Sequence, residues 1–187
     1  MRYKTCASVA EKTPKRLKQT LTKALKKSDY AEIRFDFLNP NLVPDALEQI
    51  KKDLRKCVCT LRPVSEGGKF EGGEKNRISI IKLIAEYNPF LLDVELNTLS
   101  KNKNLRRYLK NTGTDILVSW HNFKQTPSNS ALKKKLTQMK KISNNIFNYK
   151  FSIIDFQVVQ IIFDRFDEMF SIFCLLIYSS NHVLNKC

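Results

Sequence analysis

A single histidine follows the strand-like run in LVSWHNFKQTP, which covers residues 117–127. The chain has only two histidines. An imidazole can take up and release protons near neutral pH because its pKa lies there. His121 is therefore a candidate general acid/base, provided that its strand ends at a site. The alternative is a loop histidine without a chemical role.

Charged side chains recur near the ends of other apolar runs. The set is Glu32 and Arg34 in AEIRFDF, Asp93 and Glu95 in FLLDVEL, and Arg62 after CVCTL. Residues two apart on a strand share a face, and a charge on an inward face is costly unless it is paired. Glu32 could be a solvated edge charge, and Asp93 and Glu95 could neutralise a neighbouring lysine. Their recurrence at the same relative place nevertheless indicates a site at the strand ends.

Strand and helix patterns alternate along the chain, and they define how these residues would be positioned. Expected strands cover 4–9, 31–37, 57–61, 90–96 and 116–120. Helices are expected to begin at Thr13-Pro14 and Pro44, and three more follow from the apolar stripes Ile78-Ile81-Ile84, Leu105-Tyr108-Leu109 and Leu132-Leu136-Met139. A strand spacing of roughly 25–30 residues predicts repeated βα units on a parallel sheet. The fold is then a (β/α)8 barrel or a doubly wound sheet.

Charge and composition change along the chain. The net charge is +15 over 187 residues, yet residues 151–187 hold only two of the 33 lysines and arginines. A strongly basic chain invites a nucleic-acid-binding reading. The lysines fall mostly on expected helix faces, however, and no nucleic-acid-binding motif accompanies them. A solvated outer ring of helices explains them more simply, so we expect no nucleic-acid partner.

The cysteines and the hydropathy of the chain indicate its cellular compartment and bear on metal binding and membrane association. The five cysteines are odd in number and scattered, and no signal peptide precedes them, which favours a reducing, cytoplasmic location. The pair in CVC lacks a second cysteine pair, so no metal site is expected. The longest apolar run, 169–178, is too short to span a bilayer, and we expect no membrane association.

Four stretches carry a resemblance to a known family. EIRFDFL (32–38), TLRPVSEGGKFEGGE (60–74), DVEL (93–96) and VSWHNFKQTP (118–127) resemble type I 3-dehydroquinate dehydratase in order and spacing. The resemblance covers residues 1 to about 145. It implies a single (β/α)8-barrel domain over 1–187, in which 146–187 is a divergent tail and the barrel is incomplete.

The resemblance also implies a reaction and a set of site residues. The reaction is dehydration of 3-dehydroquinate through a lysine imine, in the shikimate pathway, without a cofactor or metal. His121 takes the position of the general acid/base and Glu66 that of the carboxylate that orients it. Substrate binding falls to Glu32, Ile33, Arg34 and Arg62. Family members are often dimers, so a homodimer is one expected assembly.

The imine lysine is expected somewhat under thirty residues beyond the histidine. Lys150 lies 29 residues after His121 and is the candidate, although its flanking residues differ from the family pattern. An unrelated surface lysine is the alternative at this position. Lys140 and Lys141 are weaker candidates because they belong to the expected fifth helix.

Beyond Lys150 the resemblance ends. The sequence has no Ser-Arg pair to hold the substrate carboxylate and no Ser-x-x-x-Gly-Gln loop. The tail predicts a helix over 158–170 and a strand over 171–178. One hypothesis is an out-of-frame reading of an AT-rich gene, and another is a shortened, catalytically impaired relative that binds without turnover. Either way, we expect an unclosed barrel with reduced stability and activity.

Overall fold

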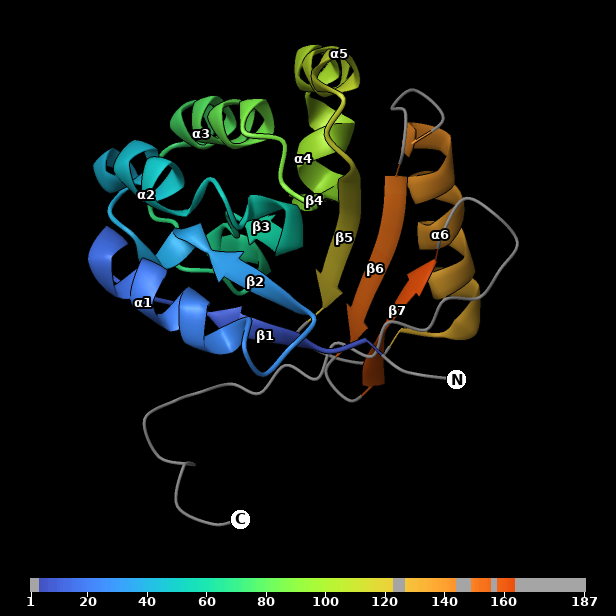
Figure 1. The fold of residues 1–187 in the computed structure, drawn as a ribbon. Helices are drawn as coiled ribbons and strands as arrows, with labels where there is room; N and C mark the ends of the chain where they lie inside the picture. The colour runs from blue at the N-terminus through green and yellow to red at the C-terminus, as the bar shows by residue number, and fades with distance from the viewer. Residues whose placement is uncertain (1–3, 123–126, 144–148, 156–157, 164–187) are drawn as a thin grey trace.

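The computed structural model describes residues 4–122, 127–143, 149–155 and 158–163, the last two segments by their backbone. One seven-stranded sheet forms the centre, with its strands in chain order (Figure 1). Its first six strands are parallel and the seventh is antiparallel. The strands are β1 (Cys6–Val9), β2 (Tyr30–Arg34), β3 (Cys57–Thr60), β4 (Leu91–Glu95), β5 (Ile116–Asn122), β6 (Tyr149–Asp155) and β7 (Val158–Phe163).

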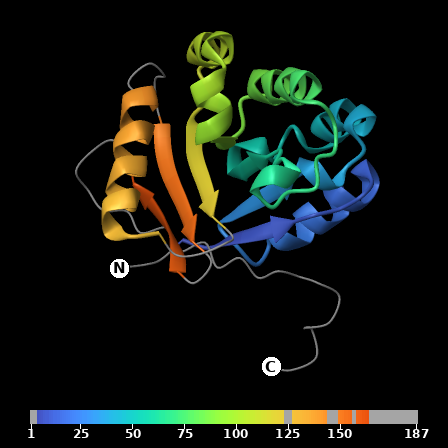
Figure 2. The same ribbon diagram turned by 180° about the vertical axis from the view of Figure 1, so that it is seen from behind.

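Helices connect the parallel strands and lie on the outer side of the curved sheet (Figures 1 and 2). They are α1 (Pro14–Ala24), α2 (Val43–Ile50), α3 (Glu74–Glu86), α4 (Leu96–Lys101), α5 (Lys103–Thr112) and α6 (Asn129–Ser143). Short 3-10 turns η1 (Phe35–Phe37), η2 (Pro40–Leu42), η3 (Leu54–Lys56) and η4 (Val64–Glu66) complete the connections. This alternation is the (β/α)8-barrel type of fold that the sequence predicts, because each helix returns the chain to start the next parallel strand.

Helix α1 illustrates how local sequence sets the elements. Pro14 occupies the first turn, and the Thr13 hydroxyl accepts a hydrogen bond from the Arg16 backbone N–H. Leu17 and Leu21 then lie one turn apart and are fully buried. The cap and the apolar spacing together make this the helix that the sequence predicts.

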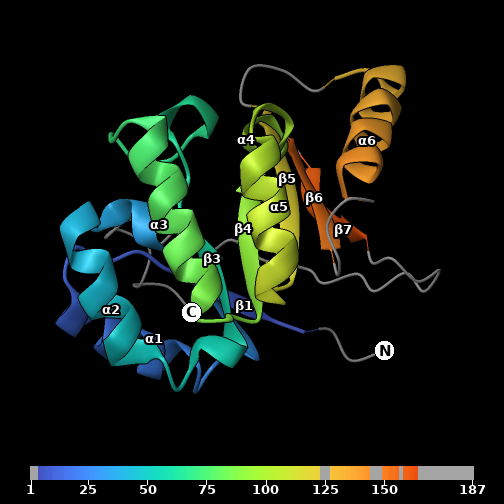
Figure 3. The same ribbon diagram turned by 90° about the horizontal axis from the view of Figure 1, so that it is seen from above.

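The core lies between the sheet and the helices. Strand residues such as Ile33 and Val94 belong to the same apolar cluster as Ile81 and Ile84 of α3. Helix α3 contacts α2 on one side and α5 on the other, as the view from above shows (Figure 3). None of the helices within the described residues is long and apolar enough to cross a membrane.

Cys57 and Cys59 in the described core are free thiols. Burial raises the pKa of Cys57 to about 12, and it raises the pKa of Cys59 well above the ordinary range. Cys6 is also buried. These thiols therefore serve as small apolar core residues, since a thiolate would be needed for metal binding or nucleophilic attack.

Two sequence expectations about elements are wrong. Residues 158–163 form strand β7, so the predicted helix over 158–170 is incorrect for these residues, where VVQIIF is rich in β-branched side chains that favour a strand. Residues 164–170 and the expected strand over 171–178 lie outside the described residues. The expected second strand is also too long, because the chain turns into η1 after Arg34.

The sheet is open. Within the described strands no pairing connects β7 back to β1, and β7 runs antiparallel to β6. A closed (β/α)8 barrel requires the last strand to pair with the first in the parallel sense. Among the residues described, the fold is therefore an incomplete barrel, as the sequence predicts.

Candidate active site

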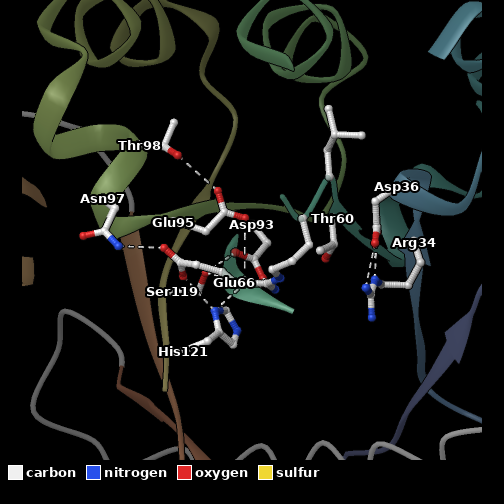
Figure 4. Close-up of polar contacts among 12 residues, drawn as sticks. Arg34, Asp36, Thr60, Glu66, Asp93, Glu95, Asn97, Thr98, Ser119 and His121 are labelled. Atoms are coloured by element: carbon white, nitrogen blue, oxygen red, sulfur yellow. Dashed lines mark hydrogen bonds and ion pairs between the residues drawn. The ribbon is translucent and has the colours of Figure 1, made fainter. Parts of the chain in front are cut away.

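Buried polar side chains meet at the carboxyl ends of β3, β4 and β5 (Figure 4). Arg62 Nη2 lies 2.5 Å from Asp93 Oδ2, and its Nη1 donates to Ser119 Oγ at 2.9 Å. Ser119 in turn donates to Asp93 Oδ1 at 2.5 Å. The three side chains form a closed ring that fixes the Arg62 guanidinium at the centre of the cluster.

His121 completes the cluster at the end of β5. Its Nδ1 lies 2.7 Å from Arg62 Nη1 and 3.1 Å from Glu66 Oε2. A guanidinium can only donate and a carboxylate can only accept, so Nδ1 satisfies one of them at a time. With the proton on Nδ1 the ring donates to Glu66, and with the proton on Nε2 it accepts from Arg62. The tautomer of His121 therefore decides whether Nδ1 forms its hydrogen bond with Glu66 or with Arg62.

Burial is the main cause that lowers the pKa of His121, which is only 9% exposed. The hydrogen bond to Glu66 acts in the opposite direction, and the charge of Arg62 lowers the pKa further. The neutral imidazole is therefore favoured near neutral pH, and in that state the ring can act as a base.

Glu66 is held from behind by a residue that sequence reasoning missed. Asn97, from the first turn of α4, donates from Nδ2 to Glu66 Oε1 at 2.9 Å. The other carboxylate oxygen of Glu66 is left to face His121 (Figure 4). The only signal in the sequence is that Asn97 directly follows DVEL, so the end of β4 delivers it to the site.

The loop that carries Glu66 depends on glycine. Gly67 has φ 78°, in the left-handed region, and ends η4 directly after Glu66. A Cβ built on Gly68 would lie 2.0 Å from the Arg62 carbonyl oxygen. The EGG sequence is therefore required for the loop to fold back against Arg62, and this places Glu66 beside the arginine.

Glu32 lies on the same sheet but contacts neutral partners. Its Oε2 accepts from Ser8 Oγ at 3.1 Å and its Oε1 from Thr60 Oγ1 at 2.9 Å. Ile33, the next residue, is fully buried in the apolar core. The alternation of the strand thus brings Glu32 to the inner face, and the structure does not bring the Ile33 side chain to the polar cluster.

Arg34 is set apart from the cluster around His121 (Figure 4). Its Nε and Nη2 donate to the two oxygens of Asp36 at 2.9 and 2.7 Å, and its guanidinium stacks over Phe37. Asp36 also accepts from the Lys69 backbone N–H at 2.9 Å. A cavity of about 530 Å³ is lined by Asp36, Phe37 and Lys69, and Arg34 is not among its lining residues.

A second arginine is buried behind the first. Arg77 of α3 lies with its Nη1 2.8 Å from Glu95 Oε2, and Glu95 Oε1 lies 3.8 Å from Arg62 Nη1. Burial raises the pKa of Glu95 to about 7, although the two arginines lower it. Sequence reasoning missed Arg77, since in EKNRISII it reads as an exposed helix residue.

The backbone of Lys150 pairs at a different level of the sheet from His121. In the β5–β6 register Lys150 is opposite Leu117, whereas His121 is opposite Ile154. Four residues along a strand correspond to about 13 Å. The backbone of Lys150 therefore lies near the N-terminal end of β6, four residues along the strand from the level of His121. Lys140 and Lys141 lie in the last turn of α6.

The chemistry of the cluster follows from its parts. A buried histidine that is held by a carboxylate can move a proton, and an adjacent arginine can stabilise negative charge on a substrate oxygen. Within the described residues no three His, Cys, Asp or Glu side chains gather as metal ligands would.

A comparison with protein-family models matches residues 5–149 to type I 3-dehydroquinase. The chain belongs to the type I 3-dehydroquinase family. The matched residues contain His121, Glu66 and Arg62 and end one residue before Lys150. The family that the sequence motifs predict is thereby confirmed.

Individual relatives agree with the type I 3-dehydroquinase assignment. The 3-dehydroquinate dehydratase of Methanocaldococcus jannaschii is 33% identical over 129 residues, covering 68% of this chain and 57% of the relative. That of Dehalococcoides mccartyi is 35% identical over 119 residues, covering 62% and 51%. The chain thus spans between half and three fifths of the length of these curated relatives.

Solved structures of 3-dehydroquinate dehydratases share the fold. The enzyme of Geobacillus kaustophilus superposes with a TM-score of 0.68 at 21% identity, covering 76% of this chain and 59% of that one. The enzyme of Aquifex aeolicus gives a TM-score of 0.61 at 25% identity, covering 80% and 65%. The open sheet therefore corresponds to part of a larger barrel.

Proposed function

We propose that this chain dehydrates 3-dehydroquinate to 3-dehydroshikimate, as a hydro-lyase of the shikimate pathway. The observation that carries the proposal is the buried contact of His121 with Glu66 and Arg62, which joins three motifs of a type I 3-dehydroquinase. The relatives that it matches are named 3-dehydroquinate dehydratases.

The proposed chemistry begins with a lysine imine. The lysine Nζ attacks the ketone carbon, the carbonyl oxygen leaves as water, and the resulting iminium acts as an electron sink. His121 removes a proton from the carbon next to the iminium, which becomes an enamine. The enamine expels the hydroxyl group one carbon further on, and this group takes the proton from His121 and leaves as water. Hydrolysis of the conjugated imine then restores the lysine.

The other residues of the cluster position this exchange. Glu66, held by Asn97, keeps the His121 ring oriented, and a lowered pKa keeps the ring neutral as a base. Arg62 supplies positive charge beside the ketone region. Glu32 and Arg34 are assigned to the substrate hydroxyls, from the inner face of β2.

Lys150 is the lysine that the family pattern assigns to the imine, and its level in the β5–β6 register is the point that needs testing. Borohydride added together with 3-dehydroquinate should reduce the imine to a stable adduct, which peptide mass mapping locates. We expect the adduct on Lys150. An adduct on Lys140 or Lys141 would show that a lysine of α6, and not Lys150, forms the imine.

Turnover itself is tested on the chain as written, by following the absorbance of the conjugated enone product. We expect a rate above the uncatalysed reaction that His121→Gln abolishes. His121→Gln should still allow the borohydride adduct, because imine formation and proton transfer belong to different residues. No rate with the unmodified chain would reject the proposal.

A second candidate function is binding without turnover, and the level of Lys150 favours it. In that case 3-dehydroquinate binds at the arginine cluster and no imine forms. Calorimetry would then show binding that Arg62→Met abolishes, while borohydride leaves the mass of the protein unchanged.

A further inference from the structure

Arg77 and Glu95 form a buried ion pair that the proposed reaction does not use. Glu95 is fully buried at the end of β4 and Arg77 is 1% exposed, although α3 lies on the outer layer. Removing a charge from water is costly unless partners compensate for it. Such a pair therefore calls for an explanation.

Arg77 contacts both the backbone directly before Arg62 and a carboxylate that lies near the Arg62 side chain. Its Nη1 donates to the Leu61 carbonyl oxygen at 3.0 Å, and Leu61 directly precedes Arg62. The same Nη1 donates to Glu95 Oε2 at 2.8 Å, while the other oxygen of Glu95 faces Arg62 Nη1 at 3.8 Å. The Arg77 guanidinium thus contacts the backbone directly before Arg62 and also the Glu95 carboxylate, which faces the Arg62 guanidinium.

The carboxylate between the two arginines is shared unequally. Among the described residues Glu95 Oε1 accepts no hydrogen bond, whereas Oε2 accepts from Arg77 and Thr98. The hydrogen-bonded oxygen of Glu95 is therefore the one that faces Arg77 of α3, not the one that faces Arg62. This leaves the Arg62 guanidinium with its short contacts to Asp93, Ser119 and His121.

We infer that Arg77 is a positioning residue, which acts through Glu95 and the Leu61 carbonyl to keep Arg62 against His121. Its importance for turnover rests on the function proposed above, but its effect on His121 does not. Without Arg77, Arg62 is the remaining cation that the described residues place beside Glu95, and Arg62 moves toward it and away from His121. Without Glu95, the two arginines repel each other and Arg62 is pressed toward His121.

The test reads the titration of His121 by NMR in the full chain labelled at histidine. The groups that face the ring are Arg62, Glu66 and Asp93. The chain has two histidines, and loss of one signal in His121→Gln assigns it. Arg77→Met should raise the pKa of His121 by about half to one unit, because Arg62 withdraws.

Opposite signs make the test specific. Glu95→Gln should lower the pKa of His121, and the double variant Arg77→Met/Glu95→Gln should return it close to the native value. Arg77→Lys keeps the charge, but an ammonium cannot reproduce the fork of the guanidinium, so a partial rise is expected. Glu74→Gln is the matched control: it removes the half-exposed partner of Arg77 on α3 and should leave His121 unchanged.

Two results would overturn the inference. If all variants melt at lower temperature while the pKa of His121 stays constant, Arg77 only ties α3 to the sheet. If Arg77→Lys titrates like the native chain, only the charge of Arg77 matters and its position does not. Should Arg77→Met fail to fold, Glu95→Gln and Arg77→Lys still decide. A chain without turnover whose His121 titration shifts as expected would retain the inference and reject the proposed function.

Discussion

At the scale of single residues, His121 Nδ1 is the most informative atom, because one donor and one acceptor approach it. If Nδ1–H donates to Glu66, the lone pair of Nε2 is left as the base. The orientation of the base thus depends on the Glu66 carboxylate more than on the histidine itself.

Glu66→Gln tests this dependence. Loss of the carboxylate removes the interaction that raises the pKa of His121, so the acid limb of the kcat/KM profile should move to lower pH. We also expect kcat to fall roughly ten- to a hundredfold, since the ring loses its orientation. Glu86→Gln, at an exposed position of α3, is the matched control. An unchanged pH profile in Glu66→Gln would contradict the role given to Glu66.

Glu95 links the same cluster to stability. Its pKa rises from an ordinary 4.5 to about 7 on folding, so the folded state binds more protons between these values. The stability that Glu95 contributes is present below pH 4.5 and is lost as the pH rises through 7. The free energy of unfolding of the native chain should therefore fall, relative to Glu95→Gln, as the pH rises through this window. Urea unfolding of both proteins at several pH values measures the difference, and parallel curves would contradict the raised pKa.

At the scale of elements, the Glu66 loop shows how one backbone position controls the site. Gly68→Ala places a methyl group against the Arg62 carbonyl, and we expect a loss of about 1–3 kcal/mol in unfolding free energy together with displacement of Glu66. Gly73→Ala is the control, because a Cβ there meets nothing within 4 Å. Equal melting temperatures for both variants would show that the loop adapts freely.

The sequence predicted the repeated elements well and their exceptions poorly. Period and caps locate α1, and short apolar runs locate β3 and β5, because these features are local. Helix α4 was missed, since it follows β4 without any intervening loop residue. Strand β7 was taken for a helix, because a short apolar run fits both periodicities.

For the site, the sequence correctly predicted neighbouring residues only when those residues belong to a recognisable motif. His121, Glu66 and Arg62 come from motif runs, and the structure brings their side chains within hydrogen-bonding distance. Asn97 and Arg77 could not be found, because their significance depends on how α4 and α3 dock against the sheet. The imine role of Lys150 remains a prediction.

At the scale of the whole molecule, the sheet formed by the described strands is open. A barrel that does not close leaves backbone groups of its first and last strands without ladder partners, and this favours association. Replacing residues 146–187 with the corresponding segment of the Methanocaldococcus jannaschii relative should close the barrel. We expect a higher melting temperature, a monodisperse sample and at least tenfold higher turnover, because a charge-assisted contact to the substrate carboxylate is worth about 1.5–3 kcal/mol. Gel filtration and the enone assay measure both effects, and an unmodified chain that already matches the chimaera would contradict this expectation.

The strict chain order of the strands has a consequence for biosynthesis. From β2 to β7, each strand pairs with the strand that the ribosome delivered immediately before it. The growing sheet therefore needs no segment that is still untranslated, and each new βα unit docks onto a surface that already exists. His121, Glu66 and Arg62 all lie within the first five strands and their loops, so their contacts can form while the rest of the chain is still being synthesised. Changes to the last part of the gene thus leave the contacts among His121, Glu66 and Arg62 intact. The two ends of the protein can therefore vary independently.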